Sequence, residues 1–79
     1  MKNIEIYSTD NCNWCVRAKT LLENKGLDYE ERDISSDRAR ALEMVERSGR
    51  RTVPQIFIEG ESIGGVDELS ALNREGNLN

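Results

Sequence analysis

Residues 4–15 of the chain are Ile4-Glu5-Ile6-Tyr7-Ser8-Thr9-Asp10-Asn11-Cys12-Asn13-Trp14-Cys15. The β-prone side chains at the start predict a strand over residues 4–8. The apolar spacing that follows predicts a helix from about Trp14 to Lys25. Cys12 and Cys15, the only cysteines in the sequence, therefore stand where a strand passes into a helix. Two cysteines separated by two residues at such a junction indicate a redox-active pair.

The position of Cys12 favours the chemistry of an attacking thiol. In thiol–disulfide exchange the nucleophile is the thiolate. A helix N-terminus offers unpaired N–H groups and partial positive charge, so we expect Cys12 to ionise more readily than a free cysteine. Cys15 lies one turn further along, and we expect it to be more buried and to act as the resolving thiol. The alternative of a structural disulfide is disfavoured because so short a loop removes little entropy from the unfolded chain.

The sequence contains no histidine, which weakens the other common interpretation of paired cysteines. A tetrahedral zinc site needs four ligands from cysteine, histidine or carboxylate groups, and only one cysteine pair is available here. We therefore expect no metal site built by this chain alone.

Composition limits the remaining classes of function. The length of 79 residues predicts one domain over residues 1–79, and the net charge of −4 argues against nucleic-acid binding. No apolar run approaches the ~20 residues of a membrane span. The N-terminal residues lead directly into the first strand, so we expect no signal peptide. Two cysteines without an export signal favour a reducing compartment, the cytoplasm.

The rest of the chain continues an alternation of strands and helices. The predicted elements after the first helix are a strand Leu27 to Ile34, a helix Asp37 to Ser48, a strand Gln55 to Ile58, a strand Glu61 to Ile63, and a helix Val66 to about Arg74. The first strand–helix–strand unit predicts parallel strands with a right-handed crossover. Glu59-Gly60 predicts a tight hairpin turn between the last two strands. The resulting class is α/β, in the order β-α-β-α-β-β-α.

Two details of the middle of the chain can also be predicted. The strand Leu27 to Ile34 is polar and is expected near a sheet edge. Either Ser35 or Ser36 is suited to cap the helix that follows. The apolar positions of that helix are Ala39, Leu42, Met44 and Val45.

Pro54 is the only proline, and it directly precedes the most apolar strand. A proline cannot donate to a sheet ladder, so one interpretation is an ordinary strand-start proline. The other is a cis proline beside the redox pair, which would turn the backbone of Val53 outward for pairing with an extended peptide. These residues alone leave both interpretations open.

Three motifs lie along the chain: the Cys12–Cys15 pair, Thr52-Val53-Pro54 about forty residues later, and Gly64-Gly65-Val66-Asp67. Together they resemble the motifs of the dithiol glutaredoxins, of the bacterial glutaredoxin 3 type, and the resemblance covers nearly the whole chain. It implies a thioredoxin fold with a four-stranded mixed sheet flanked by three helices, and a cis bond before Pro54. It also implies that the Cys12/Cys15 pair reduces protein disulfides and glutathione mixed disulfides, with glutathione as co-substrate and no bound cofactor.

The resemblance further implies a glutathione site and a set of partners. The implied binding residues are Trp14, Thr52, Val53, Pro54, Gly65, Val66 and Asp67. The backbone of Thr52 and Val53 would pair with the cysteine moiety of glutathione, and the helix N-terminus at 65–67 would hold the γ-glutamyl carboxylate, as helix N-termini readily do. Disulfide-bonded or glutathionylated proteins, ribonucleotide reductase among them, are the implied partners of a monomeric enzyme.

The chain departs from this family pattern at several positions. Asn13 stands where proline is usual, and Thr9 stands where many relatives carry a lysine. The missing positive charge would have to come from Lys19, Arg50 or Arg51, and Arg51 is expected to be the best placed because it adjoins Thr52. A nearby Asp10 would disfavour the Cys12 thiolate.

Two alternative functions remain at this stage. Asn13 permits a 2Fe–2S cluster held between two monomers, with Cys12 of each chain and two glutathione thiols as its four thiolate ligands. A redoxin recharged by a thioredoxin reductase is the other alternative, and the glutaredoxin-like segment Gly64 to Asp67 speaks against it.

Overall fold

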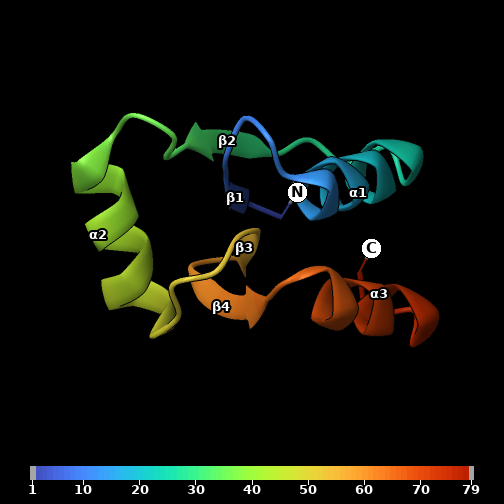
Figure 1. Cartoon of the computed structure of the whole chain (residues 1–79). Helices are drawn as coiled ribbons and strands as arrows, with labels where there is room; N and C mark the ends of the chain where they lie inside the picture. Colours follow the sequence, from blue (N-terminus) through green and yellow to red (C-terminus); the bar gives the residue numbers. More distant parts are fainter. Residues whose placement is uncertain (1, 79) are drawn as a thin grey trace.

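The computed structural model describes residues 2–78, and its elements follow the predicted order (Figure 1). They are β1 (Ile4–Ser8), α1 (Asn13–Asn24), β2 (Glu30–Asp33), α2 (Arg38–Ser48), β3 (Gln55–Ile58), β4 (Glu61–Gly64) and α3 (Val66–Arg74). None of the helices in this described part has the length and apolar character needed to cross a bilayer.

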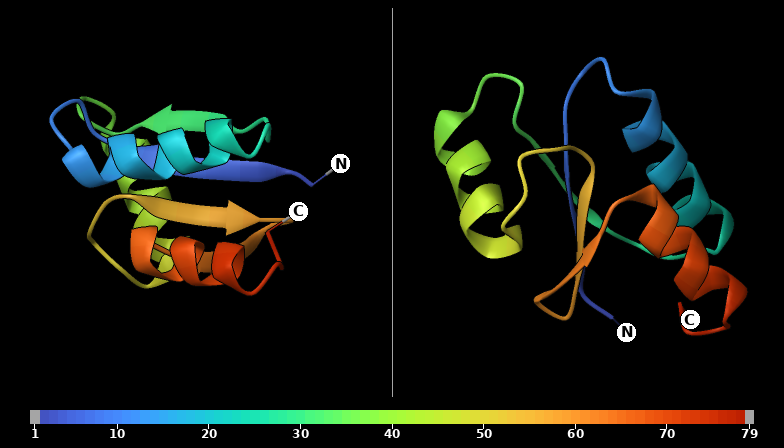
Figure 2. Two further views of the ribbon diagram at one scale, coloured as in Figure 1. Left: turned by 90° about the vertical axis from the view of Figure 1, so that its right-hand side faces the viewer. Right: turned by 60° about the horizontal axis from the view of Figure 1, so that its bottom comes forward.

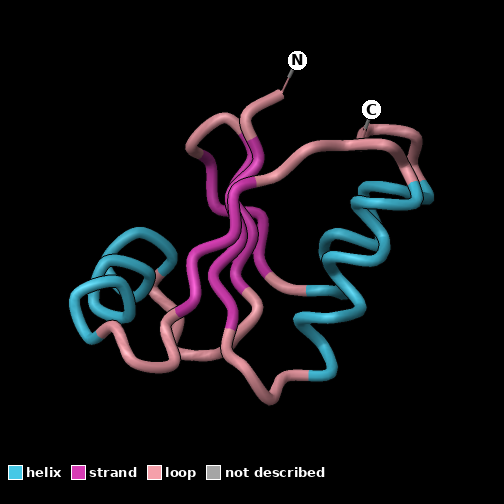
Figure 3. The backbone as a smooth tube through the Cα atoms, turned by 90° about the horizontal axis from the view of Figure 1, so that it is seen from above, coloured by secondary structure: helices cyan, strands magenta, loops and turns pink. Residues whose placement is uncertain are grey.

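The four strands form one mixed sheet in the order β2-β1-β3-β4. β1 pairs in parallel with β2, while β1 with β3 and β3 with β4 are antiparallel. Figure 3 shows three layers, with α2 on one face of the sheet and α1 and α3 on the other. This is the predicted architecture of a four-stranded mixed sheet flanked by three helices, and β2 lies at a sheet edge as its polar sequence suggested.

The main apolar core lies between the sheet and the α1/α3 layer. Ile4 and Ile6 point to this side because alternate residues of a strand face the same way. The buried members of the cluster are Ile4, Ile6, Ala18, Leu22, Ile56, Ile58, Leu69 and Leu78. This packing fixes the N-terminal ends of α1 and α3 near each other at one end of the sheet, as both views of Figure 2 show.

The opposite face of the sheet is built differently, because charged groups are buried under α2. Tyr7 and Phe57 pack edge to face with ring centroids 5.5 Å apart. Beside them Glu5, only 6 % exposed, accepts hydrogen bonds from Arg47 Nη2 at 3.0 Å and from Arg32 Nη2 at 2.7 Å. The Arg47 guanidinium also lies 4.0 Å from the centre of the Phe57 ring.

This charged layer explains why the predicted apolar positions of α2 are only partly confirmed. Met44 is buried and Val45 packs beside it, but Ala39 is exposed and Leu42 is 54 % exposed. The helix face turned to the sheet carries Arg40, Glu43, Met44 and Arg47, at i, i+3, i+4 and i+7 spacing. Glu43 accepts a hydrogen bond from Tyr7 on β1, and Arg47 donates to Glu5 and Tyr7 on the same strand, so polar side chains occupy part of the face where an apolar stripe would be expected.

The start of α2 also differs from the prediction. Asp37, and not Ser35 or Ser36, is its N-cap, with the carboxylate accepting the Arg40 N–H at 3.0 Å. Ser35 is engaged elsewhere, since its hydroxyl accepts the Asp10 N–H at 2.8 Å. The preceding strand is shorter than predicted, because only Glu30–Asp33 pair with β1.

The predicted hairpin between β3 and β4 is confirmed. Glu59 and Gly60 have φ values of 54° and 80°, so both central residues of the turn adopt positive φ. Two such residues are the signature of the type I′ turn, whose twist matches that of antiparallel strands. The hairpin places the start of α3 directly beside the start of β3.

Candidate active site

Cys12 caps the N-terminus of α1. Its backbone is extended, with φ −119° and ψ 105°, and its Sγ accepts the Cys15 N–H at 3.0 Å. The Cys12 side chain is partly exposed. A sulfur that already accepts a hydrogen bond from the first turn of a helix is well placed to carry negative charge. The predicted location of Cys12 is therefore confirmed.

Cys15 is fully buried behind it, at 0 % exposed, and both cysteines are free. Burial, together with the hydrogen bond to Cys12, raises the pKa of the Cys15 thiol to about 12. The two sulfurs are thus chemically unequal, with one accessible and one held protonated in the interior.

The segment between α2 and β3 contacts Cys12. The Val53–Pro54 peptide bond is cis, and Pro54 is buried immediately before β3. The carbonyl oxygen of Val53 lies 3.9 Å from Cys12 Sγ, which donates to it as a thiol. Pro54 therefore starts a strand and is also a cis proline beside the redox pair.

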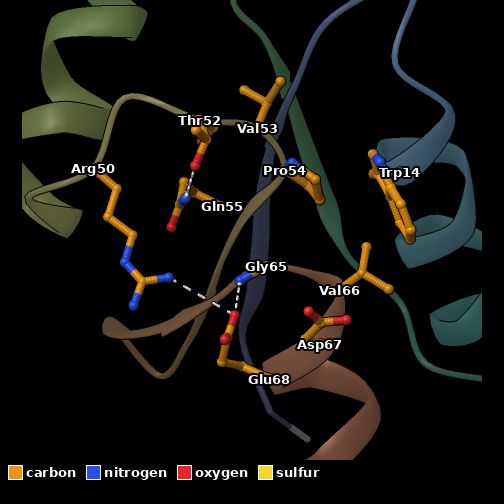
Figure 4. Close-up of a pocket in the computed structure, with 10 residues that line it drawn as sticks. All are labelled: Trp14, Arg50, Thr52, Val53, Pro54, Gln55, Gly65, Val66, Asp67 and Glu68. Carbon is orange, nitrogen blue, oxygen red and sulfur yellow. Dashed lines mark hydrogen bonds and ion pairs between the residues drawn. The ribbon is translucent and has the colours of Figure 1, made fainter.

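A groove of about 310 Å³ opens beside this segment, between α1 and the start of α3 (Figure 4). We call it the active-site groove. All seven residues that the family resemblance implied for glutathione line it: Trp14, Thr52, Val53, Pro54, Gly65, Val66 and Asp67. Trp14 stands at one wall of the groove with 54 % of its surface exposed.

Three further residues line the active-site groove, namely Arg50, Gln55 and Glu68. The expectation that Arg51 is the best-placed cation is not met, because Arg50 lines the groove and Arg51 does not. The Arg50 guanidinium lies 3.8 Å from a carboxylate oxygen of Glu68, across the mouth of the groove. Glu68 also accepts the Gly65 N–H at 2.7 Å and so caps α3.

Gln55 holds the wall of the groove from beneath. It is 1 % exposed, and its Nε2 donates to the Thr52 carbonyl at 2.9 Å and to Thr52 Oγ1 at 3.2 Å. A polar residue at the start of the most apolar strand is the sequence signal that could have identified this role. The places of Arg50 and Glu68 in the active-site groove could be found only from the tertiary structure.

Lys19, another cation considered as a source of positive charge near Cys12, is engaged by β2. Lys19 forms an ion pair with Glu31 at 2.8 Å, and Glu31 also accepts the Ser8 hydroxyl at 2.7 Å. The pKa of Lys19 is raised by its hydrogen bond to Glu31. Interaction with the neighbouring Asp33 side chain raises the pKa of Asp10.

The described residues offer no cluster of three or more histidine, cysteine or carboxylate side chains arranged to hold a metal ion. A 2Fe–2S cluster takes four protein or thiol ligands, and of the two cysteines only Cys12 is accessible, because Cys15 is buried. The residues of a single chain therefore do not fit a resident cluster. A cluster shared with a second chain and two external thiols stays a prediction.

The sequence resembles known proteins along most of its length. The glutaredoxin family profile matches residues 4–63. Glutaredoxin 3 of Escherichia coli (strain K12) is 50 % identical over 78 residues, covering 99 % of this chain and 94 % of that protein. A glutaredoxin of Pseudomonas aeruginosa is 41 % identical over 78 residues, covering 99 % and 93 %.

Solved structures give the same result for the fold. A crystal structure of a buckwheat glutaredoxin–glutathione complex superposes with a TM-score of 0.87 at 32 % identity, covering 98 % of this chain and 73 % of that one. The solution structure of glutaredoxin from Brucella melitensis gives a TM-score of 0.83 at 47 % identity, covering 96 % and 83 %.

Proposed function

The chain belongs to the glutaredoxin family of thiol–disulfide oxidoreductases and has the thioredoxin fold, and on this premise we propose that it reduces disulfides at the expense of glutathione. The observation that carries the proposal is the position of Cys12. Its sulfur caps α1, accepts the Cys15 N–H at 3.0 Å, and adjoins the active-site groove through Val53.

The first reaction we propose is removal of glutathione from a mixed disulfide. The Cys12 thiolate attacks the glutathionyl sulfur, a Cys12–glutathione disulfide forms, and the substrate leaves as a thiolate that takes up a proton. A second glutathione thiolate then attacks the glutathionyl sulfur of this intermediate. Oxidised glutathione leaves, and the Cys12 thiolate is restored.

The second proposed reaction uses both cysteines. Cys12 attacks a protein disulfide and forms a mixed disulfide with one substrate sulfur, while the other leaves as a thiol. Cys15 loses its proton as it attacks Cys12, so a Cys12–Cys15 disulfide forms and the substrate leaves fully reduced. Two glutathione molecules then return the pair to the dithiol and become oxidised glutathione. The high pKa of Cys15 supports this division, because a buried protonated thiol does not compete as the first nucleophile.

We propose that the groove residues orient glutathione for this attack. The backbone of Thr52 and Val53 would pair with its cysteine moiety, and Trp14 and Pro54 would flank it. The N-terminus of α3 at 65–67 would hold the γ-glutamyl carboxylate, since a helix N-terminus favours an anion. Holding the sulfur in line with Cys12 lowers the entropic part of the barrier.

A pair of single variants tests the proposal. In an assay that couples oxidised glutathione to NADPH through glutathione reductase, Cys12→Ser should abolish turnover of a small glutathione mixed disulfide. Cys15→Ser should retain this turnover but lose the reduction of a protein disulfide. Loss of the small-substrate activity in Cys15→Ser would contradict the assigned roles, and an inactive folded wild type would contradict glutathione dependence itself.

The remaining proposals concern the oligomeric state, the cellular compartment and the substrates of the enzyme. We propose that it acts as a monomer in the cytoplasm on disulfide-bonded or glutathionylated proteins, with ribonucleotide reductase as one candidate. Size-exclusion chromatography and disulfide trapping with Cys15→Ser test these points. The visible absorption of anaerobically purified protein tests the shared-cluster alternative, for which this chain supplies only Cys12.

A further inference from the structure

We propose that a second groove, between β4 and α3, docks a basic segment of the protein substrate. This inference rests on the proposed function, because it concerns how a polypeptide disulfide is presented to Cys12. The second groove has a volume of about 300 Å³. It is lined by Ser62, Ile63, Glu68, Ala71, Leu72 and Glu75.

The second groove combines an apolar floor with an acidic rim. Ile63 and Leu72 form part of the floor, and both pack on the main core beneath while remaining partly exposed. Glu68 in α3 and Glu75, the C-cap residue of that helix, are exposed and seven residues apart, which places them about two turns apart on one face. Glu61 adds an exposed carboxylate at the start of β4. The matching ligand is an aliphatic side chain flanked by lysine or arginine.

The second groove continues the active-site groove, because Glu68 lines both. In Figure 4, Glu68 lies at the lower boundary of the active-site groove, next to Gly65. A polypeptide whose disulfide to glutathione lies at Cys12, or which is itself disulfide-bonded to Cys12, can therefore pass Glu68 and reach the second groove along one surface. The active-site groove alone suffices for the tripeptide, so the second groove would be used only by longer substrates.

The form of β4 indicates how such a segment would bind. Ile56 pairs with Gly64 and Phe57 pairs with Ser62, so Ile63 is an extra residue in a β-bulge. A bulge at a sheet edge disrupts the ladder and discourages pairing with another strand. The segment would therefore bind through its side chains and not as an added strand.

The two edges of the sheet differ in how their charges are paired, and the difference favours the β4 edge as the docking surface. At β2, Arg32 pairs with Glu30 at 3.1 Å, and Glu31 pairs with Lys19 at 2.8 Å, so much of the edge charge is already neutralised. At the other edge Glu68 pairs with Arg50 at 3.8 Å, while Glu61 and Glu75 form no ion pair within residues 2–78. Unpaired carboxylates around an apolar floor leave the negative potential available to a cationic partner.

The test compares two glutathionylated peptides of equal length, with Lys-Leu-Lys or Glu-Leu-Glu sequences on both sides of the cysteine. The double variant Glu61→Lys/Glu75→Lys reverses the charge of two of the three rim carboxylates and leaves Glu68, which also lines the active-site groove, in place. Exposed residues elsewhere supply a charge-matched control, Asp28→Lys/Glu46→Lys. Turnover of bis(hydroxyethyl) disulfide with glutathione reports the basal activity of each protein.

The wild type should prefer the lysine peptide by about tenfold in kcat/KM at low salt, and the preference should shrink in concentrated salt. The rim variant should lose the preference and keep the basal activity, while the control should keep both. Equal turnover of the two peptides by the wild type, or an unchanged preference in the rim variant, would overturn the docking surface. Loss of the preference in the control would also overturn it, since net charge alone would then be responsible.

A binding measurement separates this inference from the proposed function. A labelled lysine peptide in which serine replaces cysteine should still bind the wild type more tightly than the rim variant in fluorescence anisotropy. If the wild type failed to turn over bis(hydroxyethyl) disulfide, the proposed glutathione-dependent function would be wrong. The anisotropy titration would still show whether the second groove binds the lysine peptide.

Discussion

Replacing Glu5 by glutamine should lower the free energy of unfolding of the protein, because it disrupts the charged layer between the sheet and α2. Glu5 lies in the central strand β1, with only 6 % of its surface exposed. Its two carboxylate oxygens accept hydrogen bonds from Arg47, and one of them also accepts from Arg32. Glutamine preserves the size of the side chain but removes the charge that compensates these two guanidinium groups.

The size of the effect follows from the ionisation of Glu5. The hydrogen bonds from Arg47, and then those from Arg32, hold the pKa of Glu5 at about 2, against an ordinary 4.5. At about 1.36 kcal/mol per pH unit this difference corresponds to about 3 kcal/mol of folding free energy. Because the folded pKa is the lower one, this stability is fully present above about pH 5 and is lost as the pH falls toward 2.

Urea unfolding of the reduced protein, followed by circular dichroism, measures this directly. At pH 7 Glu5→Gln should lose about 3 kcal/mol, a large share of the stability of a small domain. The difference from wild type should shrink as the pH approaches 2, where the native carboxylate is about half protonated. Glu46→Gln, at an exposed position of α2, is the matched control and should change stability little. A Glu5→Gln loss below about 1 kcal/mol, or one independent of pH, would refute the reasoning.

Two further predictions test the cysteine pair and the helix cap. Iodoacetamide at pH 8 should label Cys12 and spare Cys15, whose pKa is raised to about 12 by burial; a peptide map with equal labelling would contradict this. Asp37→Ala should lower the free energy of unfolding by about 1 kcal/mol through loss of the α2 cap, while Ser36→Ala should have little effect. A larger loss of stability for Ser36→Ala than for Asp37→Ala in urea titrations would show that Ser36 is the N-cap.

Much of the active site could be predicted from local sequence. The strand-to-helix junction at Cys12 follows from hydrophobic spacing, and that junction alone gives the sulfur its cap position. The motif residues Thr52 to Pro54 and Gly65 to Asp67 were expected to bind glutathione, and all of them line one groove. Their assignment as glutathione ligands stays a prediction.

Other features depended on contacts between elements distant in the sequence. Arg50 lines the groove where Arg51 was expected, because the turn of the chain after Gly49 decides which of two adjacent side chains faces inward. Gln55 is buried as a polar residue because Thr52 folds back onto it. Neither result can be derived from spacing, since both depend on the path of the 49–54 segment.

The sequence by itself determined the order of elements, the capping of a helix by Cys12 and the burial of Cys15, because these depend on residues a few positions apart. Only the tertiary structure decided that Val53 lies 3.9 Å from Cys12 and that Glu5 is buried between Arg32 and Arg47. Hydrophobic periodicity assumes that charged side chains face water. That assumption fails where partners from other strands and helices satisfy those charges, and such partners are known only once the chain is folded.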